Sequence, residues 1–172
     1  MHARSSGKVT RRATGSAARA AAELRALQGL RTVVGSARQH DARVRRAVGI
    51  SGSQLWALDE VAHVEGITVN ELAARLALHQ TTASNLVNAL VARRLIRRAR
   101  DRDDQRIVHL HITADGTRLL ARAPQPCSGL LVDALRRLAV RDLEKFSRSL
   151  ALLLGAMYEA APATAGEFFI AE

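Results

Sequence analysis

The chain has 172 residues and a formal net charge of +10, from 26 lysines and arginines against 16 aspartates and glutamates. This length accommodates one domain with extensions and a core that needs no disulfide or metal, and a hydrophobic fraction of 48% excludes wholesale disorder. Aromatic residues make up only 3%, which argues against an all-β core and against stacking on single-stranded bases. Such a positive charge indicates a partner with an anionic surface, such as nucleic acid.

The sequence carries no signal for secretion or membrane insertion. It has no uninterrupted apolar run of about eighteen residues, which a membrane span needs, and its basic N-terminal stretch lacks the apolar centre of a secretory signal. Cys127 is the only cysteine, so an internal disulfide is excluded, as is typical of a reducing compartment. We therefore expect a cytoplasmic protein with no membrane partner.

The N-terminal part divides into a basic stretch and a helix. Residues 1–16 contain basic residues, no acid and many Ser, Gly and Thr. We expect a flexible tail there, which is either an inert solvated terminus or an arm that contacts DNA. Residues 17–49 are rich in alanine, and Leu24 and Leu27 begin an apolar series near helical spacing. This pattern predicts a long amphipathic helix with an interruption near His40.

Residues 50–116 carry the pattern of a helix-turn-helix followed by a hairpin. Capping boxes at Ser51 and Thr68 each open a helix, and after a tight turn a further helix is predicted at about 80–93. Its polar face bears short uncharged side chains, where an ordinary solvated face more often bears Glu and Lys. Two short helices joined in this way form a helix-turn-helix, whose second helix fits the DNA major groove. The candidate DNA-reading residues are Gln80, Thr81, Thr82, Ser84, Asn85 and Asn88.

A β-hairpin is predicted directly after the recognition helix, at about 95–112. The returning strand alternates apolar and polar residues, and a hairpin in this place is a wing. Thr113 is then placed to cap the next helix. Residues 93–106 hold seven arginines against three aspartates, a net charge of +4, which suits phosphate neutralisation. The candidate wing contacts are Arg98, Arg100, Arg102, Asp104 and Arg106.

The C-terminal part, residues 117–160, is predicted to be helical apart from a break at Pro124 and Pro126, because proline disrupts a helix interior. A helix from about residue 140 carries an apolar stripe wider than a small winged-helix core requires. The stripe consists of Leu143, Phe146, Leu150, Leu153 and Met157. Residues 161–172 are expected to form a C-terminal tail.

This order of parts resembles the multiple-antibiotic-resistance regulator (MarR) family of winged helix-turn-helix transcription factors, over roughly residues 20–160. Each local match is modest, but five in the correct order and spacing are hard to obtain by chance. The matching segments are Asn70–Leu76, Thr81–Val87, Leu90–Ile96, Asp101–Arg106 and Leu110–Gly116.

The resemblance implies a mainly α fold with a small β-wing, in which the N- and C-terminal helices form a helical dimerisation domain. It further implies an obligate homodimer, joined through Leu24, Leu27 and the stripe from Leu143 to Met157. Such a dimer represses transcription from a pseudo-palindromic operator and releases the DNA when a small aromatic or phenolic effector, or an oxidant, changes the spacing of its DNA-reading heads. The alternative is a non-specific nucleoid-associated or architectural DNA binder. No catalytic constellation supports an enzyme.

The resemblance also suggests roles for individual residues. Arg106 would enter the minor groove, with Asp104 orienting its guanidinium; the alternatives are a structural ion pair for Arg106 and Arg102 as the groove reader. Gln80, Asn85 and Asn88 can pair with adenine, and Thr81 and Ser84 can serve bases or phosphates. The sequence departs from the family pattern at the expected helix cap, where His79 stands, in the motif turn, where Ala77 stands, and at Asn85.

The remaining chemistry-bearing residues do not combine into a site. The six histidines lack the cysteine or carboxylate partners of a tetrahedral metal site, so we expect neither a metal nor another cofactor. Cys127 is interpreted as a buried or incidental thiol. Trp56, the only tryptophan, is either a core residue or the wall of an effector pocket.

Overall fold

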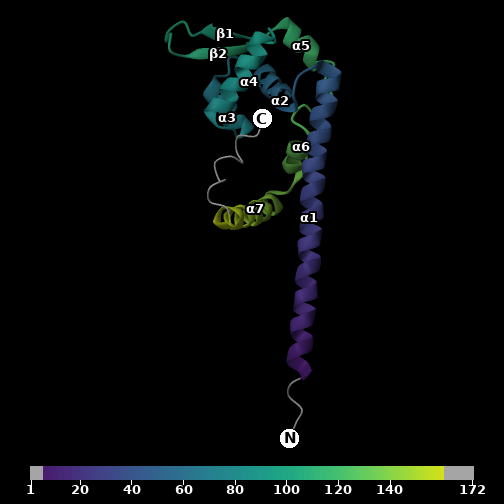
Figure 1. The fold of residues 1–172 in the computed structure, drawn as a ribbon. Coiled ribbons are helices and arrows are strands. Elements are labelled where there is room, and N and C mark those ends of the chain that lie inside the picture. Colours follow the sequence, from purple (N-terminus) through teal and green to yellow (C-terminus); the bar gives the residue numbers. More distant parts are fainter. Residues whose placement is uncertain (1–5, 161–172) are drawn as a thin grey trace. The chain divides into compact units, whose positions relative to one another are not determined.

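The computed structural model describes the backbone of residues 6–160 and the side chains of residues 16–157 and 159. It divides into two compact units, one ending at Leu131 and the other beginning at Val132. The described part is mainly helical with one two-stranded antiparallel sheet, so the predicted fold class is confirmed (Figure 1). In chain order the elements are α1 (Ser6–Val48), α2 (Gly52–His63), α3 (Val69–Leu76), α4 (Gln80–Ala92), β1 (Ile96–Arg100), β2 (Val108–Ile112), α5 (Ala114–Leu120), α6 (Leu130–Arg137) and α7 (Val140–Ala160).

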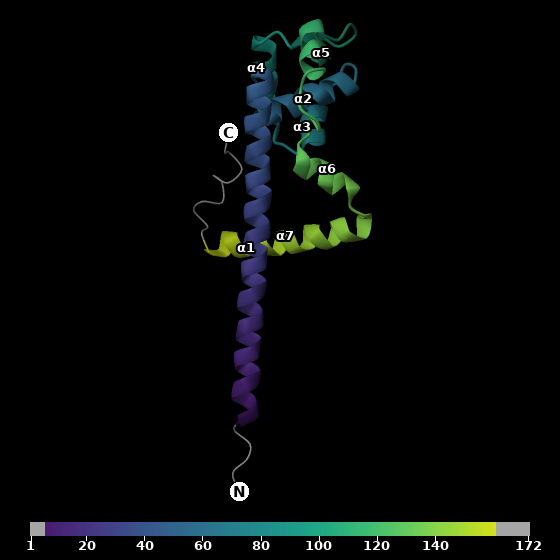
Figure 2. The same cartoon turned by 90° about the vertical axis from the view of Figure 1, so that its right-hand side faces the viewer.

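Helix α1 is longer and more regular than the sequence pattern predicts (Figures 1 and 2). Residues 6–16, expected in a flexible tail, belong to the helix, and residues 1–5 lie outside the described residues. The first proline of the chain is Pro124, so nothing in this alanine-rich stretch forces the helix to end. The interruption expected near His40 is also absent, since α1 continues to Val48. His40 is buried there, and the Asp41 carboxylate accepts a hydrogen bond from the Gly52 amide at 2.7 Å.

The two predicted capping boxes are present. Ser51 Oγ accepts from the Gln54 amide at 3.2 Å, and the Gln54 side chain accepts from the Ser51 amide at 2.9 Å. Thr68 and Glu71 exchange the equivalent bonds at the start of α3. Helix α2 ends at His63, and Gly66 supplies a positive φ of 69° in the turn that follows. These caps set where the first two helices of the winged-helix segment begin.

The core of the first unit lies between α2, α3, α4 and the hairpin. Apolar residues at three-and-four spacing point inward from each of these helices, although Leu86 and Val91 on α4 are only partly buried. The end of α1 contributes Val44 to this core. The largest fully buried side chains are Ile50, Leu55, Leu58, Ile67, Leu72, Leu90, Ile96 and Leu110, with Val44, Val61 and Val87.

Strands β1 and β2 form the predicted wing, with Ile96 opposite Ile112 at the base of the hairpin and Arg100 opposite Val108 near its tip. The loop between α2 and α3 pairs with the outer side of β2, since the Leu110 amide donates to the Ile67 carbonyl at 2.9 Å. The wing is therefore attached to the helix-turn-helix by backbone hydrogen bonds and by the buried side chain of Leu110.

The second unit contains most of α6 and all of α7. After the proline break the chain becomes helical again at Leu130, and α7 begins at Val140 as predicted. On α7 most of the predicted stripe is solvent-exposed, and Leu143 is half-buried. The expected C-terminal tail lies outside the described residues. None of the helices within residues 6–160 combines the length and apolarity needed to cross a membrane.

The junction between the wing and α5 is closely packed around Thr113 and Gly116. The Thr113 hydroxyl accepts from the Gly116 amide at 3.1 Å, which confirms the predicted cap, and it donates to the Arg94 carbonyl at 2.7 Å. Gly116 is buried, and a Cβ atom there would overlap the Leu95 carbonyl oxygen and lie 2.8 Å from Ile112 Cγ1. Only glycine fits this position without displacing backbone.

We expect Gly116→Ala to lower the free energy of unfolding by about 1–3 kcal/mol, because the added methyl overpacks this junction. The matched control is Gly35→Ala, on α1, where nothing lies within 4 Å of the added Cβ; alanine there should raise stability by about 0.5–1 kcal/mol. Urea unfolding of both variants measures the difference. Equal effects would show that the junction tolerates a side chain.

Candidate nucleic-acid interface

Helix α4 presents the uncharged polar face that the sequence predicts. Its apolar side buries Ala83, Val87 and Leu90 against the core, which turns the opposite side to solvent. His79 precedes the helix and makes no capping hydrogen bond through its side chain, in agreement with its weak capping preference. Of the predicted reading residues, Gln80, Thr81, Asn85 and Asn88 are exposed, and Thr82 and Ser84 are half-buried.

The turn between α3 and α4 is tight because Ala77 adopts the left-handed conformation. Its φ and ψ are 53° and 42°, and the Leu78 amide donates back to the Ala73 carbonyl at 2.9 Å. Glycine takes this conformation with less strain than alanine. Ala77 nevertheless keeps the turn short enough to begin α4 at Gln80.

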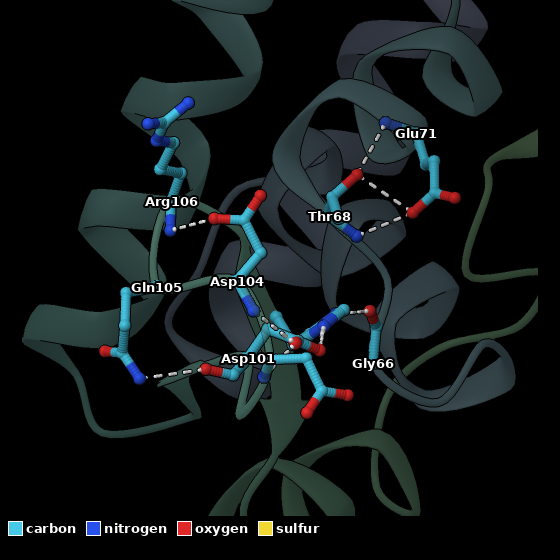
Figure 3. Close-up of polar contacts among 9 residues, drawn as sticks. Gly66, Thr68, Glu71, Asp101, Asp104, Gln105 and Arg106 are labelled. Carbon is cyan, nitrogen blue, oxygen red and sulfur yellow. Dashed lines mark hydrogen bonds and ion pairs between the residues drawn. The ribbon is translucent and has the colours of Figure 1, made fainter.

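Asp101 organises the loop at the tip of the wing (Figure 3). Its Oδ1 accepts hydrogen bonds from the backbone amides of Asp103 and Asp104, at 2.8 and 3.1 Å, and its Oδ2 lies 2.9 Å from Nε2 of His109. The Gln105 side chain donates to the Asp101 carbonyl. The backbone hydrogen bond from Asp104, followed by the bond from His109, lowers the pKa of Asp101 to about 2, so this carboxylate is ionised at neutral pH.

Asp104 does not hold the Arg106 guanidinium, as the family resemblance had suggested. Its Oδ1 accepts instead from the backbone amide of Arg106 at 2.9 Å, and Figure 3 shows the Arg106 side chain leading away from this carboxylate. The short spacing explains the difference, because a carboxylate two residues before an amide readily closes a local turn. The alternative ion pair of Arg106 with Asp101 or Asp104 is also absent among the described residues.

The arginines of the wing lack carboxylate partners, in contrast to those elsewhere. Within the described part of the chain, none of the seven arginines between residues 93 and 106 forms an ion pair, whereas several exposed helix arginines do. The wing's Asp101 and Asp104 accept from the loop backbone and from His109. The segment therefore presents a net charge of +4, with its arginines outside ion pairs, beside a neutral polar helix.

One contact between the wing and the recognition helix was missed by sequence reasoning. The Arg98 guanidinium donates to the Asn88 side-chain carbonyl at 2.7 Å. Both residues were predicted to contact DNA, but nothing in their spacing indicates that they meet. The contact depends on how the hairpin folds back over α4, which is a property of the tertiary structure.

Residues 48–107 match the sequence model of the MarR family, and this stretch contains α2, α3, α4, β1 and the loop at the wing tip. This winged-helix segment belongs to the MarR family. Members of that family are transcription regulators and not enzymes. A relative from Bacillus subtilis, described as an uncharacterised HTH-type transcriptional regulator YsmB, is 21% identical over 123 residues, covering 72% of this chain and 84% of the relative.

Solved structures share the MarR-type fold of this chain. MepR of Staphylococcus aureus, in a complex with DNA, aligns with a TM-score of 0.55 and 20% identity over 76% of this chain and 96% of its own. FabT of Streptococcus pneumoniae, also in complex with DNA, gives 0.54 and 17% over 80% and 99%. BldR of Sulfolobus solfataricus gives 0.53 and 24% over 78% and 95%. At these identities the likeness establishes the fold.

The remaining residues considered in the sequence, Trp56, Cys127 and His40, are buried or half-buried in the first unit. Trp56 is half-buried against the core, and its Nε1 donates to Glu60 at 3.2 Å; the Glu60 carboxylate also accepts from Arg75. Cys127 is buried, and burial raises the pKa of its thiol, which disfavours the reactive thiolate. His40 is buried with its Nε2 unbonded among the described residues, and desolvation lowers the pKa of its imidazole.

We expect Asp104→Ala to speed hydrogen exchange of the Arg106 amide by about five-fold, the equivalent of one net hydrogen bond. The neighbouring Asp103→Ala is a matched control, because it removes the same charge while its carboxylate accepts no hydrogen bond from the described residues. Amide exchange followed by NMR distinguishes them. An identical effect of both variants would mean that charge, and not the turn, orders this loop.

Proposed function

We propose that this protein is a transcriptional regulator that binds double-stranded DNA with a specific sequence. One observation carries the proposal: within the part of the chain that the structure describes, the wing arginines form no ion pair with a carboxylate, and they lie beside an exposed helix face of uncharged hydrogen-bonding side chains. Arginines that are not paired with carboxylates can neutralise phosphates, and short polar side chains can reach base edges in the major groove. The DNA complexes of MepR and FabT support the same use of the fold.

The recognition helix has the chemistry of an adenine reader. The amides of Gln80 and Asn85 make no side-chain hydrogen bond to the described residues, so both keep a donor and an acceptor for one base edge. Asn88 already accepts from Arg98. We therefore assign base reading mainly to Gln80 and Asn85, and a bridge between helix and wing to Asn88.

We further propose that the protein acts as a homodimer. Leu24 and Leu27 on α1 are 55% and 51% exposed, and Phe146 on α7 is 46% exposed. Exposed apolar stripes of this size on two long helices are unusual for a monomer and indicate a protein partner. A dimer of winged helices places two reading heads on adjacent half-sites, which supports a pseudo-palindromic operator.

Repression is the mode of action that we propose, with release of the DNA by a small aromatic or phenolic effector. Trp56 is the proposed pocket wall, because its ring is half-buried where α2 meets the core. The competing function is non-specific architectural binding, which the net charge of +10 favours. Footprinting on the DNA flanking the gene, repeated at rising salt, separates the two. A sharp protected palindrome supports the regulator, and uniform coverage that disappears with salt supports the architectural protein.

We expect Arg106→Ala to weaken operator binding more than about ten-fold, because its guanidinium no longer enters the minor groove. The slope of log affinity against log salt concentration should fall by about 0.9, because one positive charge near the phosphates is lost. Arg118→Ala is the control: it removes the same charge from an arginine that is paired with Asp115 on α5, and it should leave affinity almost unchanged. Gel-shift titrations at several salt concentrations measure both. If Arg106→Ala keeps full affinity, Arg106 is not the minor-groove residue, and Arg102 becomes the candidate for that contact.

We expect the double variant Leu150→Asp, Leu153→Asp to sediment as a monomer and to lose operator binding, because two charges replace apolar residues in the proposed dimer interface. Leu152→Asp is the control on the same helix, since Leu152 is 77% exposed and lies off the stripe. Analytical ultracentrifugation reports the oligomeric state. A double variant that stays dimeric would exclude α7 from the interface.

A further inference from the structure

His109, on β2, lies between two parts of the DNA-reading domain. Its Nδ1 is 2.6 Å from the carbonyl oxygen of Gly66, in the loop between α2 and α3. Its Nε2 is 2.9 Å from Oδ2 of Asp101, at the start of the wing loop. The imidazole thus joins the helix-turn-helix to the tip of the wing through two hydrogen bonds.

The protonation state of His109 follows from these two partners. A backbone carbonyl and an ionised carboxylate only accept hydrogen bonds, so each imidazole nitrogen must carry a proton to bond with both. A neutral imidazole has a single N–H and leaves one of these short approaches as a repulsive contact between two acceptors. The geometry is therefore satisfied only by the imidazolium form.

The charged groups that face His109 also favour the imidazolium. The hydrogen bond with Asp101 is the largest cause of its raised pKa, followed by the bond with Gly66 and by attraction to Asp101 and to Glu71 on α3. Ala99 is the cross-strand neighbour on β1, and the imidazole of His111, the next histidine on β2, also lies near Gly66. The charged groups that raise its pKa are carboxylates on the wing loop and on α3, while Arg97, opposite His111, is the cation on the same face of the hairpin.

The same Asp101 carboxylate shapes the loop that carries Arg106. Its Oδ1 holds the amides of Asp103 and Asp104, and Asp104 in turn holds the amide of Arg106. Loss of the His109 bond leaves Asp101 with one restraint fewer, which weakens the hold on the loop although its backbone bonds to Asp101 remain. A change at one imidazole therefore reaches the arginine at the tip of the wing.

We propose that His109 is a positioning residue for DNA binding, whose imidazolium holds the wing loop in its binding geometry, so that the affinity for DNA falls as His109 loses its proton. This proposal rests on the proposed DNA-binding function. His109 has no free ring nitrogen to read a base itself, since both nitrogens are already engaged.

The direction of the pH effect follows from linkage. The folded wing raises the pKa of His109 above its ordinary value of 6.5, so the stabilisation is fully present below that value. It disappears as the pH rises through the raised pKa of the folded protein. Asp101, with a pKa of about 2, stays ionised throughout this range. Wing order and DNA affinity are therefore highest on the acid side of neutrality and decline above it.

The test compares DNA affinity at pH values between about 6 and about 9 in the wild type, in His109→Gln and in His111→Gln. Glutamine keeps one hydrogen-bond donor but does not titrate. We expect wild type and His111→Gln to lose about three- to ten-fold more affinity across the range than His109→Gln, the equivalent of one hydrogen bond. The same pH profile in all three proteins would overturn the proposal.

A second measurement needs no DNA and no variant. Nitrogen-15 NMR of the wild-type histidine rings reports directly whether both nitrogens of His109 carry protons, and at which pH one is lost. Two protonated nitrogens at neutral pH support the imidazolium bridge between Gly66 and Asp101. If the protein then binds no DNA, the proposed function fails and the bridge remains as a structural feature of the wing. A His109 ring that is neutral at about pH 6.5 or below overturns the proposal whatever the DNA results.

Discussion

The Asp101 carboxylate is the interaction on which the arrangement of the wing depends. It accepts hydrogen bonds from two backbone amides and from His109, and Asp104 accepts from a third amide. Both carboxylates therefore accept hydrogen bonds from the wing itself, and among the described residues the neighbouring arginines form no ion pair with a carboxylate. A hairpin with nearly balanced local charges would present a much weaker field to a phosphate backbone. The positive edge of this protein therefore combines an excess of arginine, set by composition, with carboxylates that bond to the loop and not to those arginines.

The wing and the recognition helix form one surface because several contacts join them. The Leu110 amide bonds to the Ile67 carbonyl, Thr113 bonds to the carbonyl of Arg94, and Arg98 bonds to Asn88. These contacts connect the hairpin to the α2–α3 loop, to the end of the α4 segment and to the reading face. Since the backbone groups involved are paired, rearranging the wing requires breaking hydrogen bonds in the folded state. The imidazole of His109 adds a titratable member to the same set.

Much of this arrangement was predictable from local sequence. Both capping boxes, the Thr113 cap and the apolar spacing of α4 each depend on residues within one helical turn, where sequence separation and spatial separation agree. The extent of α1 was not predictable, because Ser, Gly and Thr favour a tail, whereas the absence of proline lets a helix continue through them. The expected contact of Asp104 with the Arg106 guanidinium was also wrong. An aspartate two residues before an arginine can accept from its side chain or from its backbone amide, and in this turn Asp104 accepts from the amide.

The sequence by itself determined the order of the elements, the neutral polar face of α4 and the concentration of arginine in the hairpin. These properties are set by composition and periodicity, which need no knowledge of distant contacts. Only the tertiary structure decided that Arg98 contacts Asn88 and that His109 bridges Asp101 and Gly66. It also decided that the wing arginines form no ion pairs with carboxylates within the described chain. Each of these depends on residues brought together by the register of the hairpin and its packing on the α2–α3 loop. A single side chain can reach several partners, and the fold alone selects among them.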